Sequence, residues 1–148
     1  MFADQLWSFL PIGYVLTVAV ELPILCVLLS QRHSWTTRIV AGLWLTACTY
    51  PIVVLVLPVL FAGSERWRYL LVAETFAPVA ECALFYLAYW RDPQFSNADR
   101  DATSATDDAQ HARVRAILQD MAAIVLANLA SFGIGELLNQ YNWFTGGG

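Results

Sequence analysis

Four long apolar stretches dominate the hydrophobic pattern of the 148-residue chain. They cover about residues 9–29, 39–61, 69–90 and 117–138, and each is near the roughly 20 residues that a helix needs to cross a bilayer. Short polar segments separate the first three stretches, whereas residues 91–115 form a long polar segment. The pattern therefore predicts an all-α integral membrane four-helix bundle, with residues 1–148 forming a single domain of four transmembrane spans.

The polar segment 91–115 is rich in aspartate and arginine, and its first half has the composition of a disordered loop. Thr106, Asp107 and Asp108 near its end are typical of a helix start, with acidic residues in the first turn. We expect the last helix to begin before it enters the membrane. No basic residue precedes the first apolar stretch, so we expect a retained span there and not a cleaved signal peptide.

Arginine positions predict the orientation of the chain. Six of the eight basic residues, all arginine, lie in residues 30–38 and 91–115, and the other two lie in residues 62–68. The positive-inside rule then places both termini outside and the 91–115 loop in the cytoplasm, most simply across a bacterial inner (cytoplasmic) membrane.

Composition supports a lipid environment and excludes several functions. Hydrophobic residues make up 58% of the chain and charged residues 14%, where soluble domains have about a quarter charged residues. No basic patch with interleaved aromatic residues indicates a nucleic-acid partner. Cys26, Cys48 and Cys82 lie in apolar stretches and are expected to be small buried residues, not a disulfide framework or a zinc site. His33 and His111 lie in loops, where we expect solvated side chains, so we predict neither a metal nor a cofactor.

Acidic residues inside the apolar stretches are the main candidates for chemistry. Glu74 and Glu81 share one helical face with Pro78, and Pro78 deprives the carbonyl group of Glu74 of its helical partner. Glu21 lies near the middle of the first stretch. Because ionisable groups at membrane depth are costly, we expect all three carboxyl groups to face protein or water and not lipid.

The order of polar residues suggests an internal duplication. Glu21 and Glu81 each precede a helix with a small polar centre. The two centres align as Thr46-Ala47-Cys48-Thr49-Tyr50-Pro51 and Asn128-Leu129-Ala130-Ser131-Phe132-Gly133. This alignment predicts two parallel-duplicated helical hairpins around an axis along the membrane normal, with the two glutamates facing each other at the midplane. The alternative is a pair of unrelated hairpins, because the matching segment is short.

Two main interpretations of the acidic residues stay open, beside recognition of a polar ligand group or of a partner protein. A proton- or cation-handling site is one, because two carboxyl groups close together at low dielectric can exchange protons near neutral pH. The other is structural: protonated acids hydrogen-bond across helices and hold the bundle together. The candidate residues for either role are Glu21, Glu74, Glu81, Thr46, Tyr50 and Asn128.

A ridge of small residues follows one face of the last helix. Ala123, Ala127, Ser131 and Gly135 are each four residues apart, a spacing that lets another helix backbone approach closely. We expect packing within the bundle, with a dimer face as the alternative.

The sequence contains no Gly-x-Ser-x-Gly motif and no histidine within the predicted spans. We therefore expect a non-enzymatic subunit or scaffold of a membrane complex, which contacts the lipid bilayer and either other copies of itself or other membrane proteins. A proton- or cation-coupled transporter or channel component that uses the mid-membrane glutamates is the alternative. An intramembrane enzyme acting on a lipid ranks last, because no basic residue lies at depth to hold a phosphorylated head group.

Overall fold

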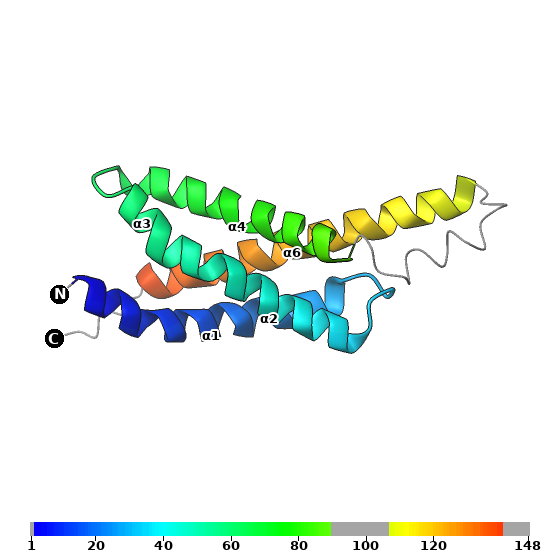
Figure 1. Ribbon diagram of the computed structural model, residues 1–148, viewed down its shortest axis with the longest axis horizontal. Helices are drawn as coiled ribbons and strands as arrows, with labels where there is room; N and C mark the ends of the chain where they lie inside the picture. Colours follow the sequence, from blue (N-terminus) through cyan, green and yellow to red (C-terminus); the bar gives the residue numbers. More distant parts are fainter. Residues whose placement is uncertain (1, 90–106, 141–148) are drawn as a thin grey trace.

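The computed structural model of the protein describes residues 2–89 and 107–140. Its elements in chain order are α1 (Phe2–Leu28), α2 (Trp35–Pro51), the π-helical η1 (Ile52–Val56), α3 (Leu57–Leu60), α4 (Arg66–Tyr89) and α6 (Asp107–Gln140). Because η1 and α3 directly continue α2, these elements form four long helical rods (Figure 1). No strand occurs in the described ranges, and the predicted all-α four-helix bundle is confirmed.

Each rod contains a segment that is long and apolar enough to cross a membrane: Leu10–Leu28, Trp35–Leu60, Arg66–Tyr89 and Gln110–Leu138. Each rod begins before its predicted span does, most of all α6, which begins at Asp107, whereas the predicted span begins at residue 117. The predicted disorder in the first half of the 91–115 loop concerns residues outside the described ranges.

The rods alternate in direction. α1 and α4 run one way, and α2–η1–α3 and α6 run the other (Figure 1). We call the end that holds the first turn of α1, the turn at residues 61–65 and the last turn of α6 the termini end. The opposite end, where residues 29–34 connect α1 to α2, is the loop end. The first turns of α6 project past the loop ends of the other helices (Figure 1).

Apolar side chains lie both inside and outside the bundle. The buried core occupies the half nearer the loop end and consists of Leu25, Leu29, Ala41, Leu45, Phe85, Ala123, Ile124 and Ala127. Many other large apolar side chains face outward, among them Val27 at 73% exposed and Leu87 at 72% exposed. Because an outer surface this apolar is unfavourable in water, it fits the lipid-facing side of a membrane helix.

Small residues set the close approach of the helices. At Gly42 in α2, a Cβ atom would lie 2.8 Å from Leu22 Cδ1 and 3.7 Å from Leu22 Cα in α1. In the predicted ridge on α6, Ala123 and Ala127 are buried in the core. A Cβ at Gly135 would meet no atom within 4 Å. Close packing on the ridge therefore involves the half of α6 nearer the loop end.

The π-helical turn η1 lies between two prolines of the second rod. The N–H of Leu57 donates to the carbonyl of Ile52, five residues earlier. In the same register Pro58 would bond to Val53, but proline has no N–H. The hydroxyl of Tyr69 in α4 donates to the Val53 carbonyl instead, at 3.2 Å. A neighbouring helix thus satisfies the backbone group that the proline leaves open.

Candidate functional site

Glu21 lies in the bundle interior and contacts two other helices. The residue is 2% exposed. Thr46 of α2 places its Oγ1 2.8 Å from Glu21 Oε2, and Ser131 of α6 places its Oγ 2.6 Å from Glu21 Oε1. Both oxygens of the carboxyl group therefore have a hydroxyl partner, each from a helix that runs antiparallel to α1.

Glu81 of α4 makes the same kind of contact with the same two helices. It is also 2% exposed. Thr49 Oγ1 of α2 lies 2.6 Å from Glu81 Oε1, and Asn128 Nδ2 of α6 lies 2.7 Å from Glu81 Oε2. As expected for carboxyl groups at membrane depth, both glutamates turn away from the lipid-facing surface.

The four contacts follow the same pattern in the two helical hairpins, of which α1 and α2 form the first and α4 and α6 the second. Glu21 bonds to the first polar residue of the segment in its own hairpin, Thr46, and Glu81 bonds to the aligned residue Asn128. Each glutamate also bonds to the aligned hydroxyl of the opposite hairpin, Glu21 to Ser131 and Glu81 to Thr49. The hydrogen-bond pattern is thus the same from either half of the chain.

Each of the three hydroxyl groups has two acceptors but one hydrogen. Besides its carboxyl partner, each lies close to a carbonyl oxygen of its own helix: Thr46 at 2.9 Å from Gly42 O, Thr49 at 3.0 Å from Leu45 O and Ser131 at 3.0 Å from Asn128 O. When the carboxyl group is ionised, the hydroxyl donates to it. When it is protonated, the hydroxyl turns to the carbonyl and accepts the carboxyl proton. The site accommodates both protonation states by turning hydroxyl hydrogens alone.

Asn128 makes the two glutamates unequal. Its Nδ2 carries two hydrogens and lies 2.7 Å from Glu81 Oε2 and 3.0 Å from the Ile124 carbonyl. Because an amide nitrogen only donates, Oε2 of Glu81 is always an acceptor. A proton bound to Glu81 therefore lies on Oε1, which faces Thr49.

A cavity of about 530 Å³ extends from the glutamate pair toward the termini end. Its lining comes from all four rods and includes Gly13, Thr17, Val53, Ala73, Leu129, Phe132 and Gly135 beside the residues that bond to the glutamates. Glu74 also lines it and accepts no hydrogen bond from any residue in the described ranges. Glu136 lies on the lining as well, and Arg66 Nη2 donates to both its carboxylate oxygens at 2.9 and 3.0 Å.

Tyr50 lies on the wall of the cavity but does not bond to a glutamate. Its ring packs edge-on against Tyr14 with 5.9 Å between centroids. Its hydroxyl oxygen lies against the backbone of Gly13, where a Cβ atom would be only 1.8 Å away. The cross-helix bonds that the sequence suggested for Thr46 and Asn128 are present, whereas Tyr50 shapes the wall.

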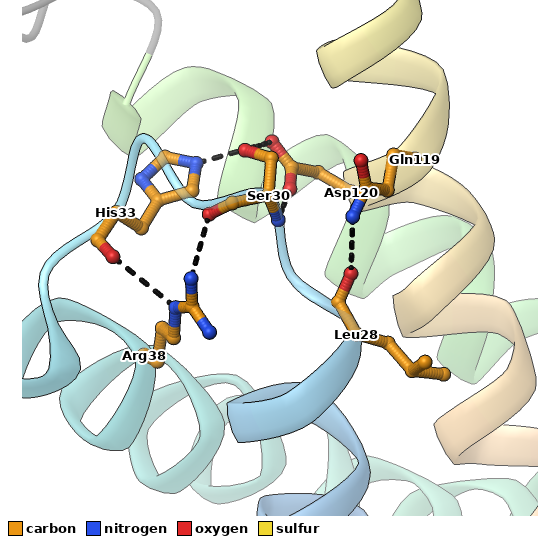
Figure 2. A network of polar contacts seen from close by, with 6 residues as sticks. All are labelled: Leu28, Ser30, His33, Arg38, Gln119 and Asp120. Carbon is orange, nitrogen blue, oxygen red and sulfur yellow. Dashed lines mark hydrogen bonds and ion pairs between the residues drawn. The ribbon is translucent and has the colours of Figure 1, made fainter.

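A second buried polar cluster closes the loop end (Figure 2). Asp120 of α6 accepts from the Ser30 N–H at 2.6 Å and from the Ser30 hydroxyl at 3.1 Å. His33 Nε2 lies 3.1 Å from the same carboxyl group. Ser30, His33 and Asp120 are all buried. The expectation that His33 is a solvated loop residue is therefore wrong, because the turn folds inward over α6, whereas His111 is exposed.

Arg38 holds the same turn from the side of α2 (Figure 2). Its guanidinium group donates to the carbonyl groups of Cys26, Ser30 and His33 at 2.6, 3.1 and 3.1 Å. The bond to Cys26 satisfies a carbonyl group in the last turn of α1, where a cation is also favoured by the helix dipole. Sequence reasoning did not identify this cluster.

Spacing along α6 contained a signal for Asp120. Asp120, Ile124, Asn128 and Ser131 recur at intervals of four and three residues, which places them on one helical face. An acid on the same face as two residues that bond to the glutamates is an indication of burial.

Metal-ligand geometry is missing from the described part of the chain, where no three His, Cys, Asp or Glu side chains converge. Cys26, Cys48 and Cys82 are free and partly buried. The site therefore offers carboxyl, hydroxyl and amide groups together with apolar walls.

The chain matches no protein-family model, no curated protein and no solved structure.

Proposed function

We propose that the protein binds a small organic cation in the central cavity in exchange for protons held by Glu21 and Glu81, as a component of transport across the membrane. The observation that carries this proposal is the pair of buried carboxyl groups at the floor of the cavity, each bonded to at least one hydroxyl group that suits either protonation state.

The charge of the cavity supports a cationic ligand. Among the described residues that line it there are four glutamates and no arginine, lysine or histidine. Arg66 pairs with one of them, Glu136, while Glu74 has no such partner within the described chain. Carboxylates in a low-dielectric surrounding attract a cation more strongly than they do in water. The same lack of basic groups disfavours a lipid-modifying enzyme that must hold a phosphorylated head group.

The size and walls of the cavity support an organic ligand over a bare metal ion. Its volume of about 530 Å³ lies within the roughly 300–1,000 Å³ typical of small-molecule sites. Leu16, Val53, Leu129 and Phe132 supply apolar and aromatic surface around the carboxyl groups. A ligand with an apolar body and one positive charge matches this combination.

Proton exchange follows from the same contacts. An arriving cation favours ionised carboxyl groups, and ionisation releases a proton from Glu21 or Glu81. Turning of the Thr46, Thr49 and Ser131 hydroxyl groups then supplies hydrogen bonds to the new charge. Ligand binding and proton release are thus linked, with no movement of heavy atoms required by the contacts.

The test is binding of tetraphenylphosphonium, a cation that carries no exchangeable proton, to purified protein in lipid nanodiscs. A pH-indicator dye in weak buffer reports proton release in the same sample. We expect saturable binding with proton release, both strongly reduced in Glu21→Gln and Glu81→Gln. Glu65→Gln removes an exposed carboxyl group outside the cavity and serves as the control. Absence of saturable binding in the parent protein, or unchanged proton release in both cavity variants, would refute the proposal.

An internal duplication is part of the proposal, and burial supports it. In α2 the buried positions are 38, 41, 42, 45, 46 and 49. Adding 82 gives 120, 123, 124, 127, 128 and 131, of which the first five are buried and the last is partly buried. In α1, positions 21, 25 and 29 are buried, and adding 60 gives Glu81 and Phe85, both buried, and Tyr89, partly buried. We infer that two parallel hairpins each contribute one carboxyl group to a shared site.

A subunit or scaffold role in a membrane complex is the second candidate. The observation that favours it is the projection of α6 beyond the loop end, where Gln110, His111, Val114 and Arg115 are exposed (Figure 1). Such a projection offers a partner a helical surface outside the bundle. Affinity purification in a mild detergent tests this role, and recovery of the chain alone would argue against it.

A further inference from the structure

Three layers follow one another along the bundle. The cavity lies on the termini-end side of Glu21 and Glu81. On the other side of this pair lies the apolar core around Leu25, Leu45 and Ile124. The Ser30–His33–Asp120 cluster lies beyond the core, at the loop end (Figure 2). A solute in the cavity is therefore separated from the loop end by an apolar layer and by a buried polar cluster.

The polar cluster converges on one side chain. Asp120 accepts from the backbone and the hydroxyl of Ser30 and faces His33, at distances of 2.6, 3.1 and 3.1 Å. His33 in turn packs edge-on against Phe85 and Tyr89 of α4, with 5.3 and 5.5 Å between ring centroids. The Asp120 carboxyl group thus joins α6 to a turn that also contacts α4.

The turn itself is held independently of α6. Arg38 of α2 bonds to three carbonyl groups within residues 26–33, one in the last turn of α1 and two in the α1–α2 connection. Separation of α6 from this connection would break the contacts of Asp120 but none of those made by Arg38. A second side-chain bond from α6 joins Gln119 Nε2 to the carbonyl of Leu28, the last residue of α1, at 2.9 Å on the exposed surface.

We propose that Asp120 is the latch of a gate at the loop end. Its bonds to Ser30 and His33 hold α6 against the α1–α2 turn and seal the apolar core from the loop end. This inference rests on the proposed cation pathway for its biological use. Whether these contacts close the apolar core to solutes from the loop end can be measured without any ligand.

The test measures access to the apolar core from the loop end. Cys26, Cys48 and Cys82 are replaced by alanine, and Ala123→Cys, at a buried core position one turn beyond Asp120, supplies a single thiol. A membrane-impermeant maleimide is added to oriented proteoliposomes from the loop side. Gln110→Cys, at an exposed position on α6, reports the rate at an open site. We expect slow labelling at residue 123 and an increase of about tenfold when Asp120→Ala removes the buried bonds, because loss of buried contacts favours local opening.

Two matched variants distinguish a latch from general loosening. Asp120→Asn retains an acceptor for the Ser30 N–H and is expected to label close to the parent rate. Gln119→Ala, at the neighbouring exposed position, removes a single surface bond and is expected to label at the parent rate. If Asp120→Ala fails to fold, Ser30→Ala removes only the hydroxyl bond and should give a smaller increase. Parent-rate labelling in Asp120→Ala, or in Ser30→Ala when that replaces it, overturns the inference, as does equal acceleration in Gln119→Ala. Because labelling needs no bound cation, its outcome is independent of the tetraphenylphosphonium measurement.

Discussion

The hydroxyl group of Ser131 lies 2.6 Å from Oε1 of Glu21, so the last helix is bonded to the first inside the bundle. Ser131→Ala removes this bond and leaves a buried carboxyl oxygen without its donor. We expect the free energy of unfolding to fall by about 0.5–2 kcal/mol, measured by reversible unfolding in mixed detergent micelles. Ser64→Ala, in the exposed turn at the termini end, should leave it unchanged. Equal stability of both variants would contradict a structural role for the bond.

The matching contacts of the two hairpins make a stronger prediction. Thr46→Asn and Asn128→Thr each change one partner of a glutamate, whereas the double variant exchanges the partners between the halves. If the hairpins are equivalent, the double variant should be more stable than the sum of the single effects predicts, by about 1 kcal/mol in a double-mutant cycle. Additive losses in the same unfolding assay would count against the duplication.

Close approach of α1 and α2 depends on Gly42. A side chain there meets Leu22, whose Cδ1 would lie 2.8 Å from the new Cβ. Gly42→Val should therefore destabilise the protein by about 1–3 kcal/mol through overpacking. Gly133→Val is the matched control, because a Cβ at Gly133 meets no atom within 4 Å. A loss of the same size at both positions would show that backbone conformation, and not packing against Leu22, is responsible.

The π-helical turn predicts a local effect at Tyr69. Tyr69→Phe removes the hydroxyl that donates to the Val53 carbonyl, and we expect a loss of about 0.5–1.5 kcal/mol. Amide hydrogen exchange should accelerate in residues 52–57 before it does elsewhere in the bundle. Tyr50→Phe removes a hydroxyl that makes no hydrogen bond with the described residues, so exchange in this segment should stay at the parent rate. Protection that is unaffected by Tyr69→Phe would refute the account of the turn.

The fold was predictable because the bilayer restricts the choices. A stretch of some 20 apolar residues has few alternatives to a membrane-crossing helix, since its backbone groups must bond within the segment. The inward position of Glu21 and Glu81 followed from the cost of a carboxyl group in lipid. Their partners were accessible by the same reasoning, because Thr49 and Ser131 lie three residues after Thr46 and Asn128 and share their faces.

The cluster at the loop end was not predictable in this way. A short segment with Arg32, His33 and Arg38 has the composition of a solvated loop, and nothing local indicates that it folds inward. Burial of His33 and Arg38 depends on tertiary contacts. Asp120 comes from a helix some 90 residues away, and Arg38 bonds to the Cys26 carbonyl in the last turn of α1. Sequence periodicity within one segment contains no information on contacts between that segment and a distant helix.

One position decides how wide the cavity is at its aromatic wall. Gly13 has only a hydrogen where other residues have a methyl or more, and the Tyr50 hydroxyl occupies that space. Any substituent at residue 13 must displace the phenol ring, and the ring borders the cavity. The width of the cavity at this wall, and with it the size of the ligand that fits, therefore depends on a residue that has no side chain.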